Sequence, residues 1–162
     1  MKELNINEVR RLAKRMIRHC TLVPESLVEC RVSNEGMLET YSECYVDVNG
    51  SLHRAIIQID RQTIDFLGSK FIPALCAHEI GHVEAKFYRR NFHPLKEEIY
   101  ADLRAMEILY DIGFSPMLVL EELKLYSREF GYDFIGDGLH PTGRQRIAEC
   151  QRHLREQPWL LL

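Results

Sequence analysis

The stretch that decides the fold is CAHEIGHVEA, residues 76 to 85. Its two histidines, His78 and His82, lie four positions apart, and Glu79 directly follows the first of them. On a helix this spacing corresponds to about 400° of rotation and about 6 Å of rise, so both imidazoles project from one face. Two imidazole nitrogens placed in this way can hold one Zn²⁺. Glu79 is offset by about 100° and lies at the edge of that face, where a general base would contact a metal-activated water.

A catalytic zinc site has three protein ligands and one open position, so a third ligand is needed. The segment KEEIYADLRAMEIL, residues 96 to 109, holds Glu98 and Asp102 four positions apart on an expected helix. Glu98 could bind the metal, while Asp102 could accept a hydrogen bond from a liganding imidazole and fix its tautomer. A solvated helix face is the alternative for this pair. The short turn YRRNFHP before it makes the two helices neighbours, which favours the metal site.

Three other residues in this region are weighed as ligands. Glu97 is next to Glu98 but points about 100° away from it. His93 lies in the turn, and because Pro94 follows it and starts the next helix, a loop role is favoured. Cys76 is about 200° away from His78 around the helix, which favours a place in the core.

A first amphipathic helix is expected over residues 6–20. Between residues 27 and 60 the hydrophobic pattern has a period of two, and strands are expected over 27–33, 43–48 and 53–60. Asn49-Gly50 between the last two strands is a hairpin signal, because both residues tolerate positive φ. The stretch RQTIDFLG then indicates a loop with a possible helical turn.

From Ser69 onward the period changes to 3.6. Helices are expected over residues 70–89, over 95–112 with Gly113 as C-terminal cap, from Ser115-Pro116 to Gly131, and over 142–156. The apolar tail, Pro158 to Leu162, could reach a cleft and inhibit the protein, but packing on the body of the domain is favoured.

The expected fold class is therefore α+β: a small antiparallel or mixed sheet of about three strands, followed by the HExxH helix, a helix with the glutamate ligand, and further helices. We expect one domain over residues 1–162. It comprises an N-terminal helix (1–24), a sheet (27–60) and a helical catalytic part (70–156).

Composition excludes several classes of partner. The 162 residues are 46% hydrophobic and 28% charged, as in an ordinary globular domain, and the net charge of -3 gives no hint of nucleic acid or an anionic membrane. No apolar run of about 18 residues could span a membrane, and the N-terminus has no apolar signal core. The 5 cysteines are scattered without a Cys-x-x-Cys pair, which is typical of free thiols in a reducing compartment. We therefore expect a cytoplasmic protein.

Three blocks of the chain together resemble the gluzincin metallopeptidases of the HtpX and CAAX prenyl protease (Ste) type. They are AHEIGH (77–82), EIYADLRAMEILYDIGFSP (98–116) and HPTGRQRIAE (140–149). The first resembles the zinc-binding helix of that family. The second resembles its Glu-x-x-Ala-Asp helix, and the third its His-Pro segment with a later Arg-Ile. The chain resembles a minimal catalytic domain of this family.

The resemblance implies a zinc endopeptidase with one zinc per chain, bound by His78, His82 and Glu98, and with Glu79 as general base. It also implies that a peptide or protein substrate pairs with an exposed edge strand at about residues 43–48. Edge pairing of this kind reads the backbone of an extended peptide.

The third block adds two catalytic candidates. His140 would donate a hydrogen bond to the developing oxyanion, and Arg146 would hold that segment or the C-terminal side of the substrate. Two rival functions remain. One is a regulatory protease of the ImmA/IrrE type. It would share the zinc residues, but the His140-Pro141 block disfavours it. The other is a catalytically silent, partner-binding domain that keeps zinc for structure, although structural sites usually have four protein ligands.

Overall fold

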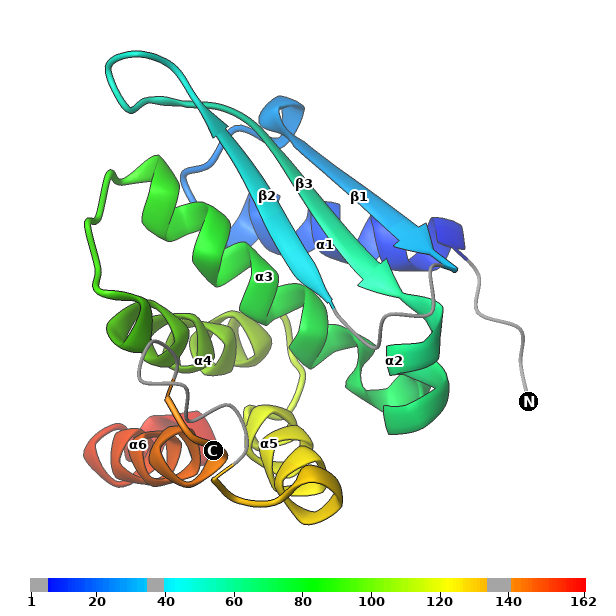
Figure 1. Cartoon of the computed structure of the whole chain (residues 1–162), viewed down its shortest axis with the longest axis vertical. Helices are drawn as coiled ribbons and strands as arrows, with labels where there is room; N and C mark the ends of the chain where they lie inside the picture. Colours follow the sequence, from blue (N-terminus) through cyan, green and yellow to red (C-terminus); the bar gives the residue numbers. More distant parts are fainter. Residues whose placement is uncertain (1–5, 35–39, 134–140) are drawn as a thin grey trace.

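The computed structural model describes residues 6–34, 40–133 and 141–162. These residues form an α+β arrangement with a three-stranded mixed sheet and six α-helices (Figure 1). The first half comprises α1 (Ile6–Cys20), the 3-10 turn η1 (Glu25–Leu27), β1 (Val28–Ser33), β2 (Tyr41–Val46), β3 (Leu52–Asp60) and α2 (Arg61–Leu67). The second half comprises η2 (Ser69–Phe71), α3 (Ile72–Phe87), α4 (Pro94–Asp111), α5 (Met117–Phe130), α6 (Gly143–Glu156) and η3 (Pro158–Leu161).

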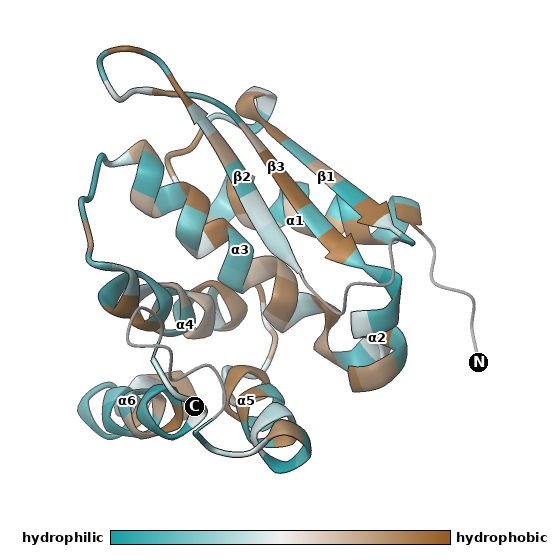
Figure 2. Ribbon diagram, in the orientation of Figure 1, coloured by the Kyte–Doolittle hydropathy of each residue, from teal (hydrophilic) through white to brown (hydrophobic). Residues whose placement is uncertain are grey.

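The sheet has the order β1-β3-β2, with β1 parallel and β2 antiparallel to the central strand. Ser42 and Cys44 of β2 lie opposite Ile57 and Ala55, which are fully buried. These residues belong to the face of the sheet that α1 and α3 cover, as Figure 1 shows. In Figure 2 the central strand β3 shows long brown, hydrophobic stretches, whereas β2, at the end of the strand order, is mostly pale. Among the described residues, β2 is therefore an edge strand, beside α3.

The edge strand lies two residues earlier than the sequence pattern predicts. The expected strand over 43–48 is β2, and it ends at Val46. The reason is Asp47, whose carboxylate accepts the backbone N–H groups of Asn49 at 2.8 Å and Ser51 at 2.9 Å and so begins the turn. The predicted hairpin is confirmed, and Gly50 supplies the positive φ of 77°.

The stretch after β3, expected to be a loop with a possible helical turn, is the helix α2. It forms because the Asp60 carboxylate accepts the backbone N–H of Gln62 at 2.8 Å and caps the N-terminus. Ile64 and Leu67 are buried on its inner side. Gly68, with φ of 96°, ends it.

Local signals set the ends of the later helices largely as expected. His93 caps α4, because its Nδ1 accepts the backbone N–H of Leu95 at 3.4 Å, and this confirms its loop role. Gly113 with φ of 84° follows the end of α4. Thr142 and Gln145 form a reciprocal capping box at the start of α6.

Helix α3 is central to the molecule because the sheet covers one side of it and α4 the other (Figure 1). Most of its residues are buried, including Cys76, which lies in the core as expected. The two helices approach closely at Gly81, where an added Cβ would lie 2.9 Å from the Cα of Ala101. The lack of a side chain at this position therefore allows α3 and α4 to touch.

The C-terminal tail packs on the body of the domain. Leu160 is only 1% exposed, and the indole of Trp159 lies edge-to-face against the ring of Tyr110, with centroids 5.0 Å apart. The tail therefore covers the C-terminal end of α4.

Within the described part of the chain, no helix combines the length and the apolarity that crossing a membrane requires.

Candidate metal centre

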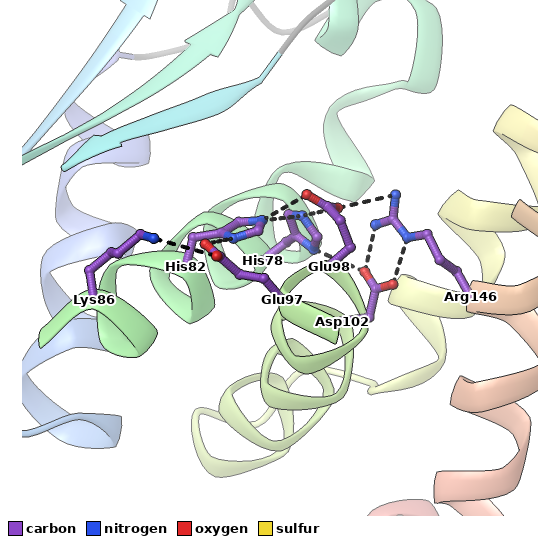
Figure 3. A network of polar contacts seen from close by, with 7 residues as sticks. All are labelled: His78, His82, Lys86, Glu97, Glu98, Asp102 and Arg146. Carbon is purple, nitrogen blue, oxygen red and sulfur yellow. Dashed lines mark hydrogen bonds and ion pairs between the residues drawn. The ribbon is translucent and has the colours of Figure 1, made fainter. Parts of the chain in front are cut away.

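The two histidines of α3 direct their Nε2 atoms toward the same point, as Figure 3 shows. The Nε2 atoms of His78 and His82 lie 3.1 Å apart. Both side chains are largely buried, with 16% and 14% of their surfaces exposed. The one-face arrangement expected from the four-residue spacing is therefore confirmed.

Glu98 of α4 completes a cluster of three ligand atoms. Its carboxylate oxygens lie 3.5 Å from Nε2 of His78 and 3.3 Å from Nε2 of His82. Ligands about 2.0–2.1 Å from a tetrahedral zinc ion lie about 3.3 Å from one another. The two Nε2 atoms are close to this separation, and each lies at about this distance from a different oxygen of Glu98, Oε2 for His78 and Oε1 for His82. Nitrogen and oxygen donors of this kind suit zinc. His78, His82 and Glu98 are the group of ligand-bearing side chains that converges in the described residues.

The electrostatics of the cluster also favour a cation. Burial disfavours the imidazolium of His78, but hydrogen bonds to Asp102 and Glu98 outweigh it and raise the pKa of His78 well above its ordinary value. The pKa of His82 is raised in the same way by Glu97 and Glu98, against the effect of burial. Burial opposes charge on Glu98 too, yet the two histidines hold its pKa well below the usual range. The carboxylates therefore favour a positive charge between the two histidines and Glu98. A divalent cation would supply that charge.

Asp102 orients the first histidine, as the spacing predicts. Its Oδ1 lies 2.9 Å from Nδ1 of His78, and the carboxylate is buried. Arg146 of α6 binds the same carboxylate through Nε and Nη2, both at 2.7 Å, and its Nη1 is 3.6 Å from Glu98. Arg146, expected to hold its own segment or the substrate, is thus bound to the carboxylates behind the cluster. His140, the proposed oxyanion donor, lies outside the described residues.

Glu97 holds the second histidine. Its Oε1 lies 3.1 Å from Nδ1 of His82, and its Oε2 lies 3.5 Å from Nζ of Lys86 (Figure 3). From the sequence, Glu97 is expected only as an alternative metal ligand, so this role was not predicted. The sequence did contain a signal for it. Each metal-binding imidazole needs a hydrogen-bond acceptor for its other ring nitrogen, and Asp102 can serve only one of the two histidines.

Glu79, the expected general base, is enclosed between α3 and the edge strand. Its side chain is only 5% exposed and makes a hydrogen bond with the hydroxyl of Ser42 on β2. Burial raises the pKa of Glu79 above its ordinary value. A carboxylate with a raised pKa holds a proton more tightly and is a stronger base. Glu79 follows His78 on the helix, and its carboxylate interacts electrostatically with His78, His82 and Glu98, so it lies beside the cluster.

Comparison of the chain with family models, with curated proteins and with solved structures gives no match. The assignment of a function therefore depends on the geometry of this cluster and on the sequence motifs that form it.

Proposed function

We propose that the chain is a zinc-dependent endopeptidase with a zincin-like fold, of the gluzincin kind that its three sequence blocks resemble. The observation that carries this proposal is the convergence of His78, His82 and Glu98 at the spacing of zinc ligands, with Glu79 beside them. Three protein ligands leave one coordination position open, which is typical of catalytic rather than structural zinc. This arrangement disfavours a catalytically silent domain.

The chain's own residues supply the acid-base chemistry. A zinc ion in such a site supplies Lewis acidity, which polarises a carbonyl and lowers the pKa of water toward about 7. Glu79 takes the proton of the attacking water and later passes it to the leaving amine. Its burial strengthens it as a base, and its hydrogen bond with Ser42 fixes its orientation toward β2.

The remaining polar residues of the site hold its geometry. Asp102 and Glu97 accept hydrogen bonds from the Nδ1 atoms of the two histidines, so that the Nε2 atoms face the metal. Arg146 fixes Asp102 from the other side with two hydrogen bonds. A site held in this way needs little rearrangement during the reaction.

The edge strand β2 offers a place for the substrate. In the described residues one side of Tyr41–Val46 pairs with β3 and the other has no strand partner. An extended peptide can add to such an edge through backbone hydrogen bonds, which suits a substrate of loose sequence. Because Ser42 of the same strand bonds Glu79, a peptide on this edge runs beside the base.

The test measures zinc content and peptidase activity on the same preparation. We expect about one zinc per chain and cleavage of unfolded casein that a chelator abolishes. Glu79→Gln should be folded, zinc-loaded and inactive, whereas His78→Ala should lose the metal. A zinc-loaded wild type that cleaves no peptide would favour the silent domain. Equal activity of wild type and Glu79→Gln would contradict the mechanism.

A further inference from the structure

A groove that the proposed mechanism does not use lies between the α2–η2 segment and α5. It has a volume of about 400 Å³. One wall consists of Leu67, Lys70 and Phe71, and the other of Glu121, Lys124, Leu125 and Arg128. The spacings of three, four and seven residues place the α5 side chains on one stripe of the helix, about 10 Å long. The groove is therefore long enough for several residues of an extended peptide.

The floor of the groove is apolar and its walls are held together. Leu67 and Phe71 are only 6% and 3% exposed, and Leu125 packs on the same core with part of its side chain accessible. Next to the groove, the ring of Phe66 on α2 contacts that of Tyr126 on α5, with centroids 5.7 Å apart. A groove fixed in this way exists before a ligand arrives, which lowers the entropic cost of binding.

Three cations line the groove, and its one carboxylate compensates only one of them. Nζ of Lys70 lies 3.1 Å from Oε2 of Glu121 and 4.6 Å from the ring centroid of Phe71. In the ranges that the structure describes, Lys124 and Arg128 form no ion pair, and Nε of Arg128 donates instead to the backbone carbonyl of Lys124 at 3.4 Å. Like charges four residues apart on a helix repel each other. Two uncompensated positive charges thus stand beside an apolar floor.

One end of the edge strand points toward this side of the molecule. Tyr41, the first residue of β2, lies opposite Gln58 of β3, and β3 runs directly into α2. Figure 1 shows this end of β2 toward α2 and the hairpin at the other end. On α3, His78 follows Phe71 by seven residues, about 10 Å along the helix. An extended chain advances about 3.3 Å per residue, so a substrate segment near the scissile bond can reach the groove.

We propose that this groove binds a segment of the protein substrate in which an apolar side chain is flanked by carboxylates. The apolar side chain lies on Leu125 and the floor, and the carboxylates pair with Lys124 and Arg128. Complementary charges of this kind select the partner and its register. The inference rests on the proposed peptidase function and names the class of substrate. A nucleic acid is disfavoured because Glu121 lines the same groove and the chain has a net charge of -3.

The first measurement is binding with chelator present, so that it depends neither on metal nor on cleavage. The probes are short fluorescein-labelled peptides with one leucine flanked by glutamates, by glutamines or by lysines, and a fourth with alanine between glutamates. Fluorescence anisotropy of wild type should give a dissociation constant about 3- to 10-fold lower for the glutamate peptide than for the glutamine peptide, the range for two exposed ion pairs. The alanine peptide should bind more weakly than its leucine counterpart, because it buries less apolar surface.

Arg128→Glu tests the charge, and Arg11→Glu is its matched control. Arg11 on α1 is also an exposed helical arginine whose Nε donates to the carbonyl four residues earlier, that of Asn7, at 3.2 Å. Arg128→Glu should bind the lysine peptide better than the glutamate peptide, whereas Arg11→Glu should keep the wild-type order. Circular dichroism should show both variants folded, as expected for surface changes. Equal binding of the glutamate and glutamine peptides to wild type, or a glutamate preference that Arg128→Glu keeps, would overturn the inference.

The second measurement links the groove to cleavage. Quenched peptides with one cleavable sequence carry the glutamate-leucine or the glutamine-leucine segment at increasing distances on either side of it. At the spacing that reaches the groove, the glutamate segment should lower KM for wild type by about 3- to 10-fold with kcat unchanged, and Arg128→Glu should abolish the difference. Binding without any effect on KM would assign the groove to a partner that is not the substrate and would overturn the inference.

Two other occupants are tested on the same preparation. Competition by octanoate as strong as that by the peptide would assign the groove to a small carboxylic acid. A dimer that Arg128→Glu dissociates would assign it to a second copy of the chain, and either result would overturn the inference. If zinc-loaded wild type cleaved no peptide while the binding preference held, the proposed peptidase function would fail, and the assignment of the groove to a substrate would fail with it.

Discussion

The Nδ1 atoms of His78 and His82, the two histidines of the candidate metal centre, are held by carboxylates in different environments. Asp102, which holds His78, is 1% exposed and is also bound by Arg146. Glu97, which holds His82, has 18% of its side chain exposed. Loss of either carboxylate should loosen an imidazole, but only the loss of Asp102 leaves a buried charge without its main partner.

For Glu97 we expect an effect on metal binding and little on folding. Glu97→Ala should raise the zinc dissociation constant by about 10- to 100-fold, the usual range for a group that orients a liganding histidine. Glu97→Gln keeps an oxygen that can accept from His82, so its loss should be smaller. Competition with a chromophoric chelator measures both values, and Glu121→Gln is the control for a surface charge change. An unchanged affinity in Glu97→Ala would show that this carboxylate does not orient His82.

For Asp102 we expect a large effect on folding. Asp102→Asn leaves the guanidinium of Arg146, whose side chain is 19% exposed, without its bidentate partner. Removing one member of a buried pair destabilises by about 3–5 kcal/mol, and the partial exposure of Arg146 places the expected loss at the lower end of that range. The measurement is urea unfolding with chelator present throughout, so that metal binding does not contribute. The double variant Asp102→Asn/Arg146→Met should recover part of the loss, because it removes the stranded charge. A single variant as stable as wild type would contradict this account of the pair.

The contact between α3 and α4 sets the distance from the histidines to Glu98. The two helices meet at Gly81 and Ala101, and an added Cβ would lie 2.9 Å from the backbone Cα on the other side. Backbone atoms cannot move away as the end of a flexible side chain can. The glycine between the two histidine positions is therefore needed for the site as well as for the packing.

Gly81→Ala should destabilise the protein although alanine is the better helix former. Helix propensity alone predicts a gain of about 1 kcal/mol, whereas overpacking a close contact loses about 1–3 kcal/mol. The variant should also bind zinc more weakly, because moving α4 displaces Glu98. Thermal unfolding and a zinc titration give the two results. A raised melting temperature would mean that the helices separate freely and that the contact is not tight.

At the element scale, the sequence predicts what depends on local periodicity and local caps. The bounds of α1 coincide with the expected 6–20, and the start of α4 follows from Pro94. The end of β2 and the helix α2 were missed because each depends on one aspartate, Asp47 and Asp60, whose side chain bonds nearby backbone. Such local hydrogen bonds compete with the hydrophobic pattern.

The candidate site likewise has a part that local sequence predicts and a part that depends on tertiary packing. The spacing of His78 and His82 on one helix specifies their common face without knowledge of the fold. The Arg146–Asp102 pair spans 44 residues, and its existence depends on how α6 packs against α4. Ser42 comes from β2, and only tertiary packing brings it to Glu79. No periodicity in the sequence encodes these contacts.

At the scale of the whole molecule, the site lies where the sheet and the helical half meet. Helix α3 contributes the two histidines of the candidate metal centre and the proposed base, α4 contributes Glu98, and Arg146 of α6 binds Asp102 behind them (Figures 1 and 3). The edge strand adds the place for a substrate. Each half thus contributes to the site, so neither half alone could form it.

The last prediction concerns the tail, for which inhibition and packing were both open from the sequence. Tyr110, which Trp159 contacts, lies twelve residues after Glu98 on α4, about 18 Å along the helix. A tail seated there is remote from the metal cluster, and Leu160 is buried beside it. Removing Pro158–Leu162 should therefore lower the melting temperature by several degrees, because burial of a leucine side chain contributes about 1.5–3 kcal/mol. The kcat/KM of the folded, zinc-loaded truncation should equal that of wild type. A rise in kcat/KM at unchanged zinc content would instead show that the tail reaches the cleft and inhibits.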